Sequence, residues 1–177
     1  MRWVSHTLIS GAICLVWAPP LTPAAVLGAT APDWLEWLGR KHLPLGRATH
    51  RGHTHNLLGW VCLMALGLSI PAWGRIVFAF AAGGALHWFC DALTVSGAPM
   101  TWWSQHRSTL FGGRLRQGSR TERGIAWAVA LCCAWLFVWQ HHSDSDRFTP
   151  YLMPWQAHYQ NGLIDAAEWR LHRFSPF

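Results

Sequence analysis

The sequence predicts an all-α protein, an integral membrane bundle of about four to five short helices. Of its 177 residues, 51% are hydrophobic and only 12% are charged, roughly half the charged share of soluble domains. It also contains 14 tryptophans, and tryptophan gathers at membrane–water interfaces. Apolar stretches recur along the chain, with proline and glycine between them. This composition excludes intrinsic disorder, because such a chain buries ample apolar surface.

The N-terminal segment predicts a helical hairpin. A helix over residues 5–18 ends at a proline turn, and a shorter helix returns over residues 23–30. This hairpin brings His6 and Asp33 to the same side. A cleaved signal peptide is the alternative, because Arg2 precedes the apolar run and residues 29–31 resemble a cleavage site. Prolines break the apolar run well before that site, which favours the hairpin.

Three more apolar segments, residues 57–70, 76–93 and 124–140, are predicted helices. Each is a little shorter than the ~20 residues needed to cross hydrocarbon upright. Pro71 and Gly74 separate the first two, so the link between them permits only a tight hairpin. Residues 1–140 are thus expected to form a membrane-embedded domain. Residues 141–177 are expected to form a polar tail, with an interfacial amphipathic helix over residues 164–174.

The charges predict an orientation in the membrane. The net charge is +6, and the loops 31–55 and 94–123 carry nine of the 14 basic residues. Both loops fall on one membrane face, which the positive-inside rule places in the cytoplasm. Five cysteines, all in apolar stretches, predict buried thiols rather than a disulfide framework. The lipid bilayer is the expected partner, and nucleic acid is not expected, because the chain has little polar scaffold.

Histidines and aspartates predict a metal site at the same face. His50 and His55 precede the helix over residues 57–70, and His87 and Asp91 share one face at the end of the next helix. Because that hairpin reverses, all four meet at one place, and Asp33 arrives from the first hairpin. Imidazole and carboxylate groups on rigid elements are what a metal site requires. The alternatives are that the histidines are structural, or that Asp91 pairs with an arginine of loop 94–123.

Two motifs resemble those of a known family. Residues 50–57, HRGHTHNL, resemble the HRGxTHSL motif of the LexA-regulated, membrane-bound metal-dependent hydrolases of bacteria. Residues 83–99, GGALHWFCDALTVSGAP, are similar to the second signature of that family, GxxxHxxxDxxTxxGxP. His6, Pro32-Asp33 and the arginine-rich stretch before Glu122 also resemble family landmarks, so that the resemblance covers roughly residues 1–140.

The resemblance implies a bacterial inner-membrane protein with a divalent-metal hydrolase site. It implies metal ligands at His50, His55, His87 and Asp91, with Asp33 and His6 as further ones. His53 falls at a variable position of the motif. Two departures are Leu35, where the family often has a second Asp that Glu36 is placed to replace, and Asn56, where the family has Ser.

We therefore expect a membrane-bound hydrolase in which a divalent metal, zinc first, activates water at the cytoplasmic face. Asp33 or Glu36 would be the general base, and Arg114 or Arg116 would stabilise an anionic transition state. An ester or phosphoester, as in a lipid-linked or phosphorylated small substrate, fits the arginines and the location. The rival hypothesis is a non-catalytic membrane assembly or partner-binding protein with a structural His/Asp cluster. A metal or proton transporter is a third hypothesis, disfavoured because so few short helices leave little room for alternating access.

Overall fold

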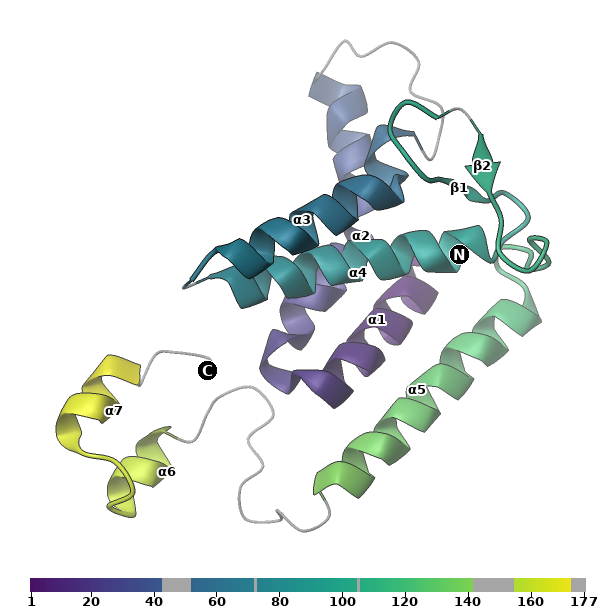
Figure 1. Ribbon diagram of the computed structural model, residues 1–177. Coiled ribbons are helices and arrows are strands. Elements are labelled where there is room, and N and C mark those ends of the chain that lie inside the picture. Colours follow the sequence, from purple (N-terminus) through teal and green to yellow (C-terminus); the bar gives the residue numbers. More distant parts are fainter. Residues whose placement is uncertain (43–51, 72, 105, 142–154, 173–177) are drawn as a thin grey trace.

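The structure, a computed structural model, describes residues 1–42, 52–71, 73–104, 106–141 and 155–172. It is mostly helical, as predicted, and α1 to α5 form a bundle while α6 and α7 lie apart from it (Figure 1). The elements in chain order are α1 (Trp3–Trp17), the 3-10 turn η1 (Pro19–Leu21), α2 (Thr22–His42), the 3-10 turn η2 (His53–His55), α3 (Leu57–Ser69), α4 (Gly74–Ala92), β1 (Ala98–Pro99), β2 (Arg107–Ser108), α5 (Arg120–His141), α6 (Trp155–Gln160) and α7 (Ala166–His172).

Helix α4 occupies the centre of the bundle and packs against α1, α2 and α3, whereas α5 packs against α1. Glycines allow α2 and α4 to approach closely. A Cβ atom on Gly28 would lie 1.8 Å from the carbonyl oxygen of Phe80, and one on Gly83 would lie 2.0 Å from that of Ala25. Any larger side chain would therefore push these two helices apart. This close contact sets the positions of Asp33 on α2 and His87 on α4.

Helix α2 corrects the prediction for the first hairpin. A short helix over residues 23–30 followed by a loop was wrong, because α2 continues through Pro32 to His42. A proline inside a helix removes one backbone hydrogen bond but does not always end the helix. Here the continuation keeps Asp33 and Glu36 one turn apart on the same helix face. The other predicted helices are found as α1, α3, α4 and α5, and α7 lies within the predicted 164–174 segment.

Helix α5 begins four residues earlier than predicted, at Arg120. The reason is a cap: the Ser119 hydroxyl accepts a hydrogen bond of 3.1 Å from the backbone N–H of Glu122. Among the described residues, the segment Arg120–Gln140 is the one that is long and apolar enough to cross a membrane. Helices α1 and α3 are apolar but shorter, at 15 and 13 residues, or roughly 20 Å against a hydrocarbon core of about 30 Å.

The segment between α4 and α5 is folded onto the end of α4. Strands β1 and β2 pair antiparallel, and Thr94 forms a parallel bridge with Leu115. The N–H groups of Leu110 and Leu115 donate to the carbonyls of Ala92 and Leu93, at 2.7 and 3.2 Å. The predicted loop over residues 94–123 is therefore structured. It covers the C-terminal end of α4, where Asp91 lies.

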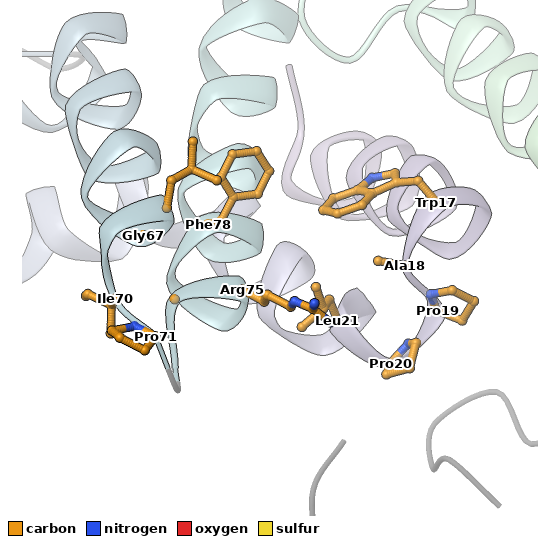
Figure 2. A pocket seen from close by; sticks show the side chains of 12 residues that line it. Trp17, Ala18, Pro19, Pro20, Leu21, Gly67, Ile70, Pro71, Arg75 and Phe78 are labelled. Carbon is orange, nitrogen blue, oxygen red and sulfur yellow. The ribbon is translucent and has the colours of Figure 1, made fainter. Parts of the chain in front are cut away.

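A cavity of about 660 Å³ lies between the turn that joins α1 to α2 and the turn that joins α3 to α4 (Figure 2). Its lining is mainly apolar, with Trp17, Pro19, Ile70 and Phe78 among the contacts, and Arg75 is the one charged residue among the described residues that line it. None of the predicted metal ligands that the structure describes, namely His6, Asp33, His55, His87 and Asp91, lines it. The cavity and the His/Asp residues thus occupy different parts of the bundle.

Candidate metal centre

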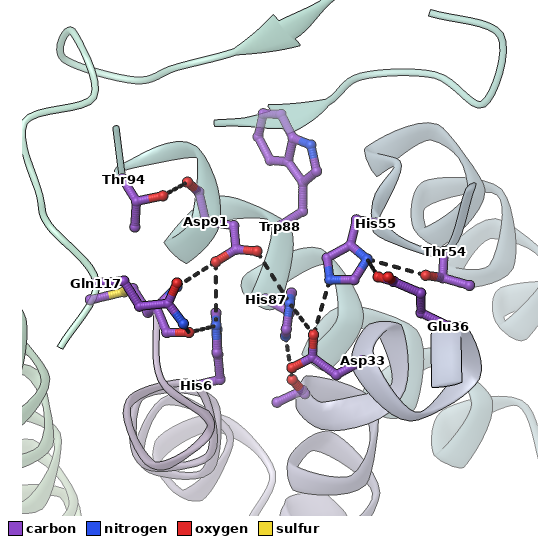
Figure 3. A network of polar contacts seen from close by, with 12 residues as sticks. His6, Asp33, Glu36, Thr54, His55, His87, Trp88, Asp91, Thr94 and Gln117 are labelled. Carbon is purple, nitrogen blue, oxygen red and sulfur yellow. Dashed lines mark hydrogen bonds and ion pairs between the residues drawn. The ribbon is translucent and has the colours of Figure 1, made fainter. Parts of the chain in front are cut away.

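His87 stands at the middle of a buried cluster of imidazoles and carboxylates (Figure 3). Its Nδ1 lies 2.7 Å from the carbonyl oxygen of Ala29 on α2. Because a carbonyl only accepts, Nδ1 carries a proton, and Nε2 is the ring nitrogen that is left to face the carboxylates. Nε2 lies 3.4 Å from Oδ2 of Asp91 and 4.0 Å from Oδ1 of Asp33. It is buried and makes no hydrogen bond with any residue that the structure describes.

His6, on α1, adds a second imidazole to the cluster. Its ring stacks on that of His87, with centroids 3.8 Å apart and an interplanar angle of 10°. Nε2 of His6 lies 3.5 Å from Oδ1 of Asp91 and 3.2 Å from the carbonyl oxygen of Met1. The amino group of Met1 pairs with the same Asp91 oxygen. His6, His87 and Asp91 are all about 1% exposed, so this half of the cluster is shielded from water.

His55, from η2, forms the other half with α2. Its Nε2 lies 3.1 Å from Oδ1 of Asp33, and its Nδ1 lies 3.5 Å from Oε2 of Glu36 and 3.1 Å from the Thr54 hydroxyl. Burial lowers the pKa of His55 below its ordinary value of 6.5, although the hydrogen bond with Asp33 opposes that shift. His55 is therefore neutral near pH 7, which is the form that ligates metals.

The donor set fits a divalent metal. Two groups each hold their ligand atoms within 4.8 Å of one another, His6 with His87 and Asp91, and Asp33 with His55 and His87. The two groups share His87, whose Nδ1 bond to a backbone carbonyl is the arrangement that orients a ligating imidazole. Glu36 contacts Nδ1 of His55 and is placed to orient that ring in the same way. Nitrogen and carboxylate donors of this kind suit zinc and related ions.

Several predicted residues lie elsewhere. His50 falls outside the described residues, so its predicted part in the cluster stays a prediction. His53 is exposed beside the cluster, and Arg114 and Arg116 are exposed on the segment before α5. The structure does not bring these two arginines into the His/Asp cluster, and their predicted stabilisation of a transition state stays untested.

The structure gives each of the two departures from the family motif a local role. Asn56 is the N-cap of α3, and its Oδ1 accepts a hydrogen bond of 2.7 Å from the N–H of Gly59. Asparagine and serine are both strong N-cap residues, so the local role of that position is kept. Leu35 packs against the apolar cluster that contains Ala31 and Trp60. Glu36, one residue further on, faces His55 instead.

Glu122 is a positioning residue that the prediction treated only as a landmark. Its buried carboxylate accepts hydrogen bonds from the N–H of Arg2 at 2.8 Å, the Ser5 hydroxyl at 2.7 Å and the N–H of Gly118 at 2.5 Å. These bonds tie the start of α1, and so His6, to the start of α5. The signal was present in the sequence as Ser119-x-x-Glu122, a helix-capping pattern.

The fold and the cluster together define a helical bundle with one candidate membrane span and a buried His/Asp centre at one end. The model of the YdjM inner membrane protein family matches residues 1–145, and the chain therefore belongs to that family. This agrees with the membrane-protein part of the resemblance seen in the motifs. Comparison with curated proteins and with solved structures gave no match.

Proposed function

We propose that the His/Asp cluster binds a divalent metal ion, zinc first, and that the protein is a metal-dependent hydrolase. The environment of His87 Nε2 supports this proposal best. This buried nitrogen lies 3.4 Å from Asp91 and 4.0 Å from Asp33, and two carboxylates that flank one imidazole nitrogen out of water favour a cation between them. A divalent ion bound by these atoms would provide that cation.

The residues of the cluster would then have different roles in hydrolysis. An ion held there supplies a Lewis acid and lowers the pKa of a coordinated water from 15.7 to about 7. The Ala29 carbonyl and Glu36 hold the rings of His87 and His55 in a ligating orientation. Asp33 is only partly buried, so it is the carboxylate best placed to accept a proton from an incoming water.

The family places the protein in the inner membrane, and we propose that the cluster lies at the cytoplasmic face. The start of α1 contacts the end of α4 through the ion pair of Met1 with Asp91, and Glu122 ties the start of α1 to the start of α5. The arginines of the segment before α5 lie at this same end, which the positive-inside rule assigns to the cytoplasm. We also propose that α1 to α4 are embedded beside α5, which makes the protein multi-pass. An ester or phosphoester at the lipid surface is the substrate class that fits this position.

Metal analysis of the purified full-length protein tests the proposal. Wild type should retain a near-stoichiometric divalent metal, whereas Asp91→Asn and His87→Gln should each lower the retained metal at least tenfold. His53→Gln is the matched control, because His53 is exposed beside the cluster. The same trace metal in wild type, Asp91→Asn and His87→Gln would contradict the proposed site.

Hydrolysis is tested separately, with nitrophenyl esters and bis(nitrophenyl) phosphate as probes. Turnover should require the metal, disappear with a chelator and return when zinc is restored. It should fall at least a hundredfold in Asp33→Asn, while His53→Gln keeps wild-type turnover. A metal-loaded protein with no turnover on either probe would contradict these ester classes as substrates.

One contact favours the rival function, a non-catalytic assembly or partner-binding protein. The amino group of Met1 pairs with Asp91 and brings a positive charge into the cluster. A closed network of this kind would hold the helices together without a metal. Under that hypothesis Asp91→Asn lowers the melting temperature by the same amount with and without a chelator. Under the metal hypothesis, only the wild type loses stability on chelation.

A further inference from the structure

The surface formed by the turn at Phe111 and the first turn of α5 carries a strong positive charge, which forms no ion pair with an acidic side chain in the described part of the chain. Its four arginines, all exposed, are Arg114, Arg116, Arg120 and Arg123. The one acidic residue between Asp91 and Arg123 is Glu122, which is buried and accepts hydrogen bonds from Arg2, Ser5 and Gly118. The carboxylate nearest in sequence is therefore turned inward, away from the four arginines.

Nothing in the helix itself accounts for these charges. Arg120 and Arg123 lie in the first turn of α5, where the helix dipole disfavours cations. Four arginines within ten residues also repel one another when exposed side by side. An anionic partner outside the protein relieves both costs.

The position of the surface identifies that partner. Arg120 begins the segment that is long and apolar enough to cross a membrane, so the arginines lie where a bilayer meets water. A cluster of basic residues next to a membrane span is typical of binding to anionic lipid headgroups. Phe111, at the tip of the turn, is 83% exposed and holds a backbone φ of 50°. An exposed aromatic ring costs free energy in water, and insertion of the ring among lipids recovers it. The backbone strain is a separate cost that this turn accepts in order to present the ring.

We propose that this surface binds the headgroups of anionic phospholipids, with Phe111 inserted beside them. The same segment is hydrogen-bonded to the end of α4 through Ala92 and Leu93, directly after Asp91. Lipid binding therefore holds the His/Asp end of the bundle at the membrane surface. This inference does not depend on metal binding or on hydrolysis.

The test uses full-length protein in nanodiscs that contain phosphatidylcholine and phosphatidylglycerol in equal amounts. Native mass spectrometry of the released protein measures which lipid is retained. Wild type should retain phosphatidylglycerol preferentially, and Arg114→Gln with Arg116→Gln should reduce that preference roughly tenfold to thirtyfold, since each basic side chain contributes a factor of about five. The matched control is Arg75→Gln with Arg170→Gln, which removes the same charge from other exposed positions.

Further arms separate the possible sources of the effect. Arg114→Lys with Arg116→Lys should keep most of the preference, because a headgroup surface responds mainly to charge. High salt should weaken the preference of the wild-type protein for phosphatidylglycerol. This test does not depend on whether any variant folds. An equal loss in the control pair would overturn the proposal, because it would show a response to net charge alone. Full displacement of phosphatidylglycerol by inorganic phosphate at constant ionic strength would also overturn it, in favour of a soluble phosphate. Metal content should not change in any arginine variant.

Discussion

His87 shows how much of the centre depends on the two nitrogens of one ring. The Ala29 carbonyl binds Nδ1 and leaves Nε2 directed at Asp33 and Asp91. A buried ring nitrogen that faces two carboxylates needs a proton or a metal cation between it and them. The same ring also stacks on His6 and contacts His55 edge-on, with centroids 5.0 Å apart. One side chain therefore joins three helices and the turn η2 at a single point.

Asn56 gives a prediction that concerns a single side chain. Asn56→Ala removes the cap of α3 and should lower the free energy of unfolding by about 0.5–2 kcal/mol, because the N–H of Gly59 loses its acceptor. Asn56→Ser should lose less stability than Asn56→Ala, since serine keeps the cap and loses only the hydrogen bond that the Asn56 amide donates to the His53 carbonyl. Thermal unfolding in detergent measures both. A serine variant as unstable as the alanine variant would show that position 56 has a role other than capping.

The contact of α2 with α4 is the feature on which the geometry of the centre depends. It brings Asp33 within 4.0 Å of His87, and it exists because Gly28 and Gly83 leave room for the opposing backbone. The extension of α2 beyond Pro32 is what places Glu36 near His55. Packing of these two helices therefore controls both halves of the cluster.

Gly28→Ala tests that contact. The added methyl group would lie 1.8 Å from the Phe80 carbonyl oxygen, so α2 and α4 must separate, at a cost of about 1–3 kcal/mol. Retained metal should fall with stability, because Asp33 moves away from His87. Gly39→Ala, on the same helix, has no atom within 4 Å of its new Cβ and should be neutral or slightly stabilising. Equal behaviour of the two variants in metal analysis and thermal unfolding would contradict this account.

The molecule as a whole has two different ends. The His/Asp cluster lies at the end of α4 that carries Asp91, near the start of α5. The cavity lies at the opposite end of α4, between the turn that joins α1 to α2 and the turn that joins α3 to α4 (Figure 2). Membership of the YdjM inner membrane protein family associates the protein with a bilayer. The proposed cytoplasmic position of the cluster then makes the two ends chemically distinguishable in intact cells.

Cysteine labelling tests this orientation. In a background with the exposed Cys62 and Cys132 replaced by serine, His53→Cys should react with an impermeant maleimide only in inside-out membrane vesicles. Trp73→Cys, at the turn between α3 and α4, is 67% exposed and should not react from that side. Labelling of position 53 from the periplasmic side would overturn the cytoplasmic assignment.

The expected boundary between residues 1–140 and 141–177 stays a prediction.

The all-α class, the hairpin of α3 and α4, and the convergence of His55, His87 and Asp91 were all predictable from the sequence. Apolar periodicity and the spacing of four between His87 and Asp91 are local properties, and a tight hairpin leaves little freedom in how its ends meet. Local signals failed for α2, because a proline weakens a helix without revealing whether tertiary contacts compensate. Packing against α4 is such a contact, and the residues of α4 that make it lie about fifty positions further along the chain.

Composition and spacing alone determined that this is a helical membrane protein with its histidines and aspartates near one face. Tertiary structure decided which atoms meet: Nε2 of His87 with two carboxylates, Glu36 with His55, and Glu122 with the start of α1. The reason is that the spacing of residues along a helix specifies which face their side chains share, but not how far they lie from another segment. Distances between segments are set by the close approach of backbones at Gly28 and Gly83 and by buried polar groups that must find partners.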